Sequence, residues 1–133
     1  MTDEQYIQEF ITNGLYEDTR GFDHTSLACI PAEDTSEAYL LIKDNGVLAG
    51  IHLAEKILKY VDPVAEVEIL INDGEEVAFG DIAMRVKANT QALLKAERLM
   101  LNIMQRMCGI ATLSRRFSFE VKDLPVKILD TRK

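Results

Sequence analysis

Cysteine is scarce in this sequence, and its 133 residues contain no long apolar run. Cys29 and Cys108 lie far apart in the chain, which indicates free thiols in a reducing compartment. No apolar stretch approaches the roughly 18 residues that a membrane-spanning helix needs. The N-terminus, MTDEQYIQEF, is acidic, whereas a signal peptide begins with basic and then apolar residues. We therefore expect a soluble protein of the cytoplasm.

Basic residues are also in short supply. The chain has 15 lysines and arginines against 22 aspartates and glutamates, which gives a formal net charge of -7. A nucleic-acid or anionic-membrane partner needs a basic footprint, so neither is expected. A small anionic ligand is still compatible with this charge, because a few arginines can form a local positive pocket in an acidic protein.

The sequence lacks the patterns that are typical of several kinds of functional site. His24 and His52 lie in unrelated contexts, and with the two cysteines they show no metal-ligand spacing, so no metal-binding residue is predicted. A glycine-rich phosphate loop of the Walker type is absent. The adjacent acids Glu17-Asp18 and Glu75-Glu76 are more typical of solvated turns than of an acid–base pair.

The residues that are present indicate one domain with a real core, because apolar residues make up 47 % of the chain. Apolar residues alternate with charged ones over residues 65–71 and 82–88, which predicts two strands. Each strand would have one solvent-exposed and one buried face, as in an antiparallel sheet that lies on helices. The first part of the chain is therefore predicted to be an α+β open-faced sandwich, a small and mostly antiparallel sheet with helices on one side.

The other expected elements of this sandwich follow from helix and turn signals. Asp44, Asn45 and Gly46 favour a tight hairpin, because Asn and Gly tolerate positive φ. The predicted elements are a helix over 3–15, an ordered loop over 16–31, the hairpin strands 37–43 and 47–51, and a helix over 52–61.

Residues 89–112 form the longest apolar-rich run without proline and predict a long helix. Asn89 or Thr90 would cap its start, and Gly109 would end or bend it. Its polar residues are spaced by four and three and so form one narrow stripe: Gln91, Lys95, Arg98, Asn102 and Gln105. The rest of the helix is apolar enough to be buried on several sides. The stripe is either a solvated strip or the lining of a wet cavity, and spacing alone favours the solvated strip.

The end of the sequence predicts the beginning of a second domain. The apolar pattern after Gly109 indicates a second helix to residue 121, and residues 126–129, VKIL, are typical of a strand. A lone final strand cannot close a core, so it either pairs with the earlier sheet or begins another domain. We favour the beginning of an α/β barrel or doubly wound sheet, with domains over 1–108 and 109–133.

Arg98, Arg132 and Lys133 are the candidate binding residues. Arginine presents a planar fork that fits a carboxylate or phosphate with two hydrogen bonds, and lysine supplies a compact charge. Two cations just past the end of a strand suit a multiply anionic ligand. By composition alone, Arg132 and Lys133 fit an ordinary charged terminus equally well.

At these residues the sequence resembles the quinolinate phosphoribosyltransferases, also called nicotinate-nucleotide pyrophosphorylases (carboxylating). The residues similar to that family's signature helix are Glu97-Arg98, Leu101-Asn102, Gln105-Arg106 and Gly109-Ile110-Ala111-Thr112. Segments 17–31, 46–50 and 73–81 resemble its loops, and 129–133, LDTRK, resembles its first barrel strand and basic tip. Cys108 and Leu99 depart from the family pattern, in which serine and threonine are commoner. The family continues into a C-terminal barrel, so we expect this chain to be an N-terminal part.

The resemblance implies that quinolinate attacks C1 of phosphoribosyl pyrophosphate through its ring nitrogen, with loss of pyrophosphate and CO₂. The product is nicotinate mononucleotide, on the route to NAD. Arg98 would bind quinolinate and reach into the barrel of a partner subunit, in a homodimer or higher homo-oligomer. Thr131, Arg132 and Lys133 would form the substrate-binding strand tip. Mg²⁺ is the implied cofactor, with its ligands expected after Lys133.

Two other interpretations remain open. One is a paralogous phosphoribosyltransferase of the same fold that acts on another anionic acceptor. The other is an inactive dimerising module or a carrier of the biotinyl or lipoyl type. A carrier needs a modifiable lysine at its hairpin tip, and the turn over residues 72–76 has none.

Overall fold

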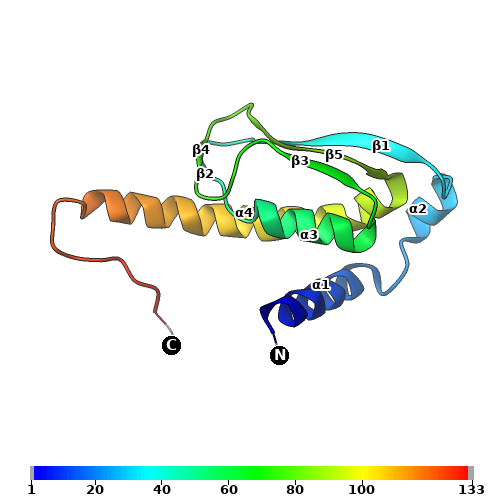
Figure 1. The fold of residues 1–133 in the computed structure, drawn as a ribbon, viewed down its shortest axis with the longest axis horizontal. Coiled ribbons are helices and arrows are strands. Elements are labelled where there is room, and N and C mark those ends of the chain that lie inside the picture. The colour runs from blue at the N-terminus through cyan, green and yellow to red at the C-terminus, as the bar shows by residue number, and fades with distance from the viewer. Residues whose placement is uncertain (1, 132–133) are drawn as a thin grey trace.

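A three-stranded antiparallel sheet forms one layer of the molecule in the computed structural model, which describes residues 2–131 (Figure 1). The strands are β1 (Thr35–Leu41), β3 (Glu66–Ile69) and β5 (Ile82–Asn89), in the order β1-β5-β3. The central strand β5 has the expected alternation: Met84, Val86 and Ala88 are buried, whereas Arg85 and Lys87 are exposed. The predicted antiparallel sheet is therefore confirmed, with strand β5 at its centre.

Helices cover one face of this sheet and leave the other open. Helix α3 (Ile51–Val61) and the first half of α4 (Thr90–Glu120) lie against the sheet, and α1 (Asp3–Thr19) packs on α4 from the other side (Figure 1). The short helix α2 (His24–Cys29) lies at one end. The fold is thus the predicted α+β open-faced sandwich.

The core lies between the sheet and the helices. Each fully buried Ile or Leu side chain contributes about 1.5–3 kcal/mol relative to an exposed one. The largest fully buried side chains are Ile11, Leu48, Ile51, Ile57, Leu58 and Met84. They come from α1, α3, β5 and the segment before α3, so these elements share one core.

The predicted hairpin over residues 37–51 is wrong. Strand β2 (Gly46–Val47) pairs with β4 (Glu76–Val77) and not with β1. The Asn45 side chain does not close a tight turn, because its Oδ1 accepts a hydrogen bond from the Phe79 N–H at 2.9 Å. The chain turns into α3 at Gly50, whose φ of +96° favours glycine, and this cuts short the expected return strand.

The segment predicted as one ordered loop, residues 16–31, contains helical structure. Helix α1 continues to Thr19 and ends where Arg20 adopts a left-handed conformation. Asp23 then caps α2 by accepting a hydrogen bond from the Ser26 N–H. Local capping therefore organises residues whose polarity indicates only a loop.

Helix α4 is longer and more exposed than the sequence indicates. Asn89 caps its start as predicted, but Gly109 neither ends nor bends it, and no second helix begins there. One glycine costs only about 1 kcal/mol relative to alanine, which the neighbouring helix formers offset. The expected burial on several sides is also wrong for the single chain. Within α4 only Ala96, Met100 and Met104 are buried, and the second half projects beyond the sheet (Figure 1).

Residues 121–131, the described part of the chain after α4, form no strand. Val126, Ile128 and Leu129 are exposed, and the segment 126–129 pairs with none of the strands within residues 2–131. A strand needs a neighbouring strand to satisfy its backbone, so the apolar pattern alone is insufficient. The proposed boundary between 1–108 and 109–133 falls inside α4. None of the helices in the described part is long and apolar enough to cross a membrane.

Candidate functional site

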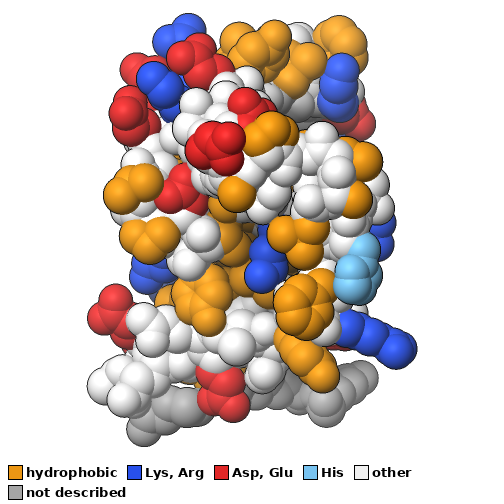
Figure 2. All heavy atoms as spheres, turned by 90° about the vertical axis from the view of Figure 1, so that its right-hand side faces the viewer, with side chains coloured by type: hydrophobic (Ala, Val, Ile, Leu, Met, Phe, Trp, Pro, Cys, Tyr) orange, Lys and Arg blue, Asp and Glu red, His pale blue; other side chains and the backbone are white. Residues whose placement is uncertain are grey.

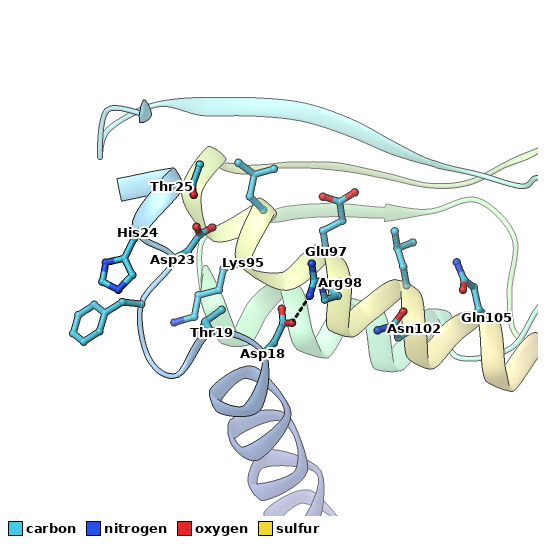
Figure 3. A pocket seen from close by; sticks show the side chains of 13 residues that line it. Asp18, Thr19, Asp23, His24, Thr25, Lys95, Glu97, Arg98, Asn102 and Gln105 are labelled. Carbon is cyan, nitrogen blue, oxygen red and sulfur yellow. Dashed lines mark hydrogen bonds and ion pairs between the residues drawn. The ribbon is translucent and has the colours of Figure 1, made fainter. Parts of the chain in front are cut away.

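A cleft of about 650 Å³ lies where α4 meets the end of α1 and the start of α2 (Figure 3). Lys95, Arg98, Asn102 and Gln105 line it from α4. The remaining stripe residue, Gln91, donates a hydrogen bond to the Ile30 carbonyl at 2.7 Å. Both interpretations of the polar stripe therefore hold in part, because it lines the cleft while Arg98, Asn102 and Gln105 remain exposed to solvent. The segments opposite α4 contribute Asp18, Thr19, Phe22, Asp23, His24 and Thr25.

The start of α4 fixes which of its faces meets the cleft. The Asn89 side chain accepts a hydrogen bond from the Ala92 N–H at 3.1 Å and donates to the Ala32 carbonyl at 2.7 Å. The Asn89 backbone N–H donates to Asp62, a buried carboxylate that also accepts from the Val64 N–H. These contacts tie α4 to the preceding loops on both sides and so set the direction of its polar stripe.

Arg98 forms an ion pair with Asp18 across the cleft. The Arg98 Nη1 lies 3.2 Å from the Asp18 Oδ1, and Figure 3 shows this contact between α4 and the end of α1. The Arg98 side chain is 73 % exposed and that of Asp18 is 23 % exposed. Pairs this open to water contribute only about 0.2–1 kcal/mol to stability, so the pair does little to hold the fold together. The contact with Asp18 does place the Arg98 guanidinium beside the end of α1.

Asp23 places a second carboxylate on the wall of the cleft. The Ser26 hydroxyl donates to Asp23 Oδ2, and the Ser26 N–H donates to Asp23 Oδ1 at 3.1 Å. These hydrogen bonds, led by that of the Ser26 hydroxyl, hold the pKa of the Asp23 carboxyl below its usual value. The adjacent rings of Phe22 and His24 stack with centroids 6.0 Å apart.

The charges around the cleft nearly balance. Asp18, Asp23 and Glu97 face Lys95 and Arg98, so this cleft by itself is not the strongly cationic pocket that two anionic substrates need. Figure 2, which views the end of the molecule near α2, shows acidic, basic and apolar side chains intermixed on that face. Further cations must come from outside this cleft for a multiply anionic ligand to bind.

The structure brings together only part of the predicted site. Arg98 lies in the cleft, whereas Thr131 is exposed beyond α4 and does not line it. Arg132 and Lys133 lie outside the described residues. Sequence reasoning missed Asp18, which was read as part of a solvated turn. The sequence carries no usable signal for Asp18, because the helix was predicted to end at residue 15 and only the structure extends α1 to Thr19.

Residues 2–131 contain no cluster of three or more His, Cys, Asp or Glu side chains that could hold a metal ion. Both cysteines are free thiols; Cys29 is exposed and Cys108 is half-buried.

Taken together, the fold and the cleft define an open-faced α+β sandwich with an exposed arginine on its longest helix. Residues 23–108 match the family model described as quinolinate phosphoribosyl transferase, N-terminal domain. The chain therefore belongs to the quinolinate phosphoribosyltransferase family.

Curated members of this family are similar in sequence to this chain and are longer than it. A quinolinate phosphoribosyltransferase [decarboxylating] of Nicotiana tabacum, named 2b and mitochondrial, is 41 % identical over 128 residues, which is 96 % of this chain and 36 % of that protein. A chloroplastic nicotinate-nucleotide pyrophosphorylase [carboxylating] of Arabidopsis thaliana is 42 % identical over 111 residues, 84 % of this chain and 31 % of that protein. The chain thus spans about a third of the length of these curated relatives.

A solved structure gives the same fold. NadC from Streptococcus pyogenes superposes with a TM-score of 0.92 at 26 % identity, over 99 % of this chain and 47 % of that one. A nicotinate-nucleotide pyrophosphorylase from Ehrlichia chaffeensis superposes with a TM-score of 0.77 at 30 % identity, over 86 % of this chain and 42 % of that one.

Proposed function

We propose that this chain is the N-terminal part of an enzyme that transfers a phosphoribosyl group from phosphoribosyl pyrophosphate to quinolinate. The transfer is coupled to decarboxylation and yields nicotinate mononucleotide, CO₂ and pyrophosphate for NAD biosynthesis. The observation that carries this proposal is the exposed Arg98 guanidinium in a cleft beside α4, within the residues that match the family model.

The charge of the substrates fits a site that is shared between subunits. Quinolinate is a dianion, and its co-substrate carries a phosphate and a pyrophosphate, so several cations must converge on the reacting atoms. Arg98 supplies one fork for a carboxylate. Because acids balance the cations of this cleft, we assign the remaining positive charge to Thr131, Arg132 and Lys133 of a second copy and to residues that follow them.

A homodimer is the assembly that would bring these groups together. Ile110, Leu113 and Phe117 are exposed on the part of α4 that projects beyond the sheet, and their spacing puts them on one helix face. An apolar face of this kind is stable in water when another protein surface covers it. We propose that it packs against the second subunit and so carries Arg98 towards the partner's site.

We also propose that the enzyme uses Mg²⁺. Its ligands would lie outside residues 2–131, because no cluster within these residues is placed to bind it. We also propose a cytoplasmic location, which the free thiols of Cys29 and Cys108 support. The plant relatives named mitochondrial or chloroplastic make an organelle the alternative, and cell fractionation with an antibody to the protein would distinguish the two compartments.

The test uses the purified full-length protein, with quinolinate or nicotinate as the acceptor and nicotinate mononucleotide formation as the readout. We expect turnover with quinolinate and none with nicotinate. Arg98→Ala should lower kcat/KM for quinolinate by at least about 30-fold, because truncating one partner of a close charge pair commonly costs about 2–5 kcal/mol. Arg85→Ala is the matched control, because Arg85 is comparably exposed but lies on the open face of the sheet.

Each outcome has a distinct meaning. Loss of quinolinate turnover in Arg98→Ala, with a normal circular-dichroism spectrum and unchanged Arg85→Ala activity, supports the proposed role. Unchanged kinetics in Arg98→Ala would remove this residue from the site. A wild-type protein that uses another anionic acceptor but not quinolinate would favour the paralogous phosphoribosyltransferase.

A further inference from the structure

The position of Asp18 is unfavourable for the helix that carries it. Helix α1 has no basic residue in its last turn, and Glu17 and Asp18 both lie there. The carbonyl end of a helix carries partial negative charge, so acids at this end are destabilising unless a cation compensates them. Arg98 on α4 is the cation that Asp18 meets, at 3.2 Å.

The two partners of this pair differ in how they are held. The Asp18 side chain is 23 % exposed and the Arg98 side chain is 73 % exposed, so the carboxylate is the more buried partner and the guanidinium the more open one. The contact joins one nitrogen to one oxygen. A guanidinium has five N–H donors, so this single contact leaves the rest of the fork facing the cleft.

The backbone of α1 is close to α4 at the level of Arg98. A Cβ atom on Gly14 would lie 2.8 Å from a methyl carbon of Leu99, the neighbour of Arg98, so only glycine fits there without displacing Leu99. Gly14 is one helical turn before Asp18. This close approach places the last turn of α1, and with it the Asp18 carboxylate, beside the guanidinium.

From this geometry we infer that Asp18 is a positioning residue that orients the Arg98 guanidinium to receive a carboxylate of quinolinate. This inference rests on the proposed function. Asp18 binds one edge of the fork and restricts its rotation, and the other edge stays available for two parallel hydrogen bonds to the ligand. Without Asp18, the exposed side chain would have to be ordered by the substrate itself, which weakens binding.

The test compares full-length wild-type protein with Asp18→Asn, Asp18→Glu and Glu17→Gln, each assayed for kcat and for KM towards both substrates. Asp18→Asn removes the charge with little change of shape, and Asp18→Glu restores it. Glu17→Gln is the matched control, because it removes an acid from the same last turn of α1 but not the one paired with Arg98. Arg98→Ala is measured alongside.

We expect Asp18→Asn to raise the KM for quinolinate by up to about fivefold, since an ion pair this open to water preorganises the guanidinium only weakly. Its kcat, its KM for phosphoribosyl pyrophosphate and its melting temperature should match those of Glu17→Gln. Asp18→Glu should recover part of the loss. A purely structural role would instead change both KM values and the melting temperature together.

Two results would overturn the inference. An unchanged quinolinate KM in Asp18→Asn would show that Arg98 needs no such partner, and a lower KM would show that Asp18 competes with the substrate. If the wild type turns over quinolinate and Arg98→Ala does not, either result removes only the role of Asp18. If the wild type has no quinolinate activity, the proposed function fails and this inference fails with it.

Discussion

The Thr112 hydroxyl accepts a hydrogen bond from the Val47 N–H at 2.9 Å, across 65 positions of the chain. One turn earlier on α4, the Cys108 sulfur accepts from the Ala49 N–H at 3.2 Å. Two side chains thus attach the projecting half of α4 to the backbone of β2 and of the segment between β2 and α3. Gly46 allows this approach, because a Cβ atom there would lie 2.6 Å from the Thr112 hydroxyl oxygen.

Thr112→Val should destabilise the protein by about 1–3 kcal/mol, because it leaves the partly buried Val47 N–H without its acceptor while keeping the side-chain shape. Thr112→Ser, which retains the hydroxyl, is the control and should lose much less. Urea unfolding followed by circular dichroism measures both. Equal losses in the two variants would mean that the methyl group, rather than the hydrogen bond, stabilises this contact.

Asp73→Ala should cost about 1 kcal/mol through the loss of a helix cap. The first residue of α3 follows Gly50, which has no side chain to cap it, and the Ile51 N–H instead donates to Asp73 Oδ1 at 2.8 Å. Asp73→Asn keeps an acceptor oxygen and should preserve most of the stability in the same unfolding measurement. No difference between the Ala and Asn variants would argue against capping from this loop.

The ionisation of Asp23 should contribute to stability above its unfolded pKa, close to the ordinary value of 3.8. Hydrogen bonds from Ser26 lower the pKa of this carboxyl in the folded state. The contribution is therefore complete above the unfolded pKa and is lost as the pH falls from 3.8 through the lowered folded value. Carbon-13 NMR titration should show this depressed pKa, and Ser26→Ala should return it towards 3.8. An unchanged titration in Ser26→Ala would contradict the assigned cause.

Phe117→Glu should shift the protein from the proposed homodimer to the monomer. Phe117 is exposed on the same face of α4 as Ile110 and Leu113, and a buried, unpaired carboxylate would strongly disfavour packing of that face. Ser118→Glu is the control, because the next residue points about 100° away around the helix. Size-exclusion chromatography with light scattering gives the mass of each variant. Dimers of Phe117→Glu as stable as the wild type would place the interface elsewhere.

Strand periodicity predicted the sheet well because each strand has one buried and one exposed face. Val86 and Ala88 point into the core, whereas Arg85 and Lys87 point outward, and this alternation is visible in the sequence itself. The hairpin prediction failed because the Asn45 side chain bonds to a distant segment at Phe79. Turn propensity describes local backbone preference and contains no information about such a partner.

The candidate site was predicted in one half only. The helical spacing of polar residues identified Arg98 and its neighbours, because these residues are local in the sequence and their face follows from the helix repeat. The opposite wall depends on how α1 packs against α4, which places Asp18 next to Arg98 although 80 residues separate them. That packing depends on Gly14 meeting Leu99, a contact that no periodicity reveals.

The unbroken course of α4 links the cleft to everything that follows it in the chain. The 31 residues of this helix rise about 46 Å at 1.5 Å per residue, with no hinge at Gly109. The direction in which the Arg98 side chain leaves the helix axis is therefore fixed relative to that of Glu120. Adding or deleting a single residue between Phe117 and Glu120 would turn the downstream chain by about 100° relative to the cleft, while the contacts that α4 makes with the sandwich through Met104, Cys108 and Thr112 stayed intact.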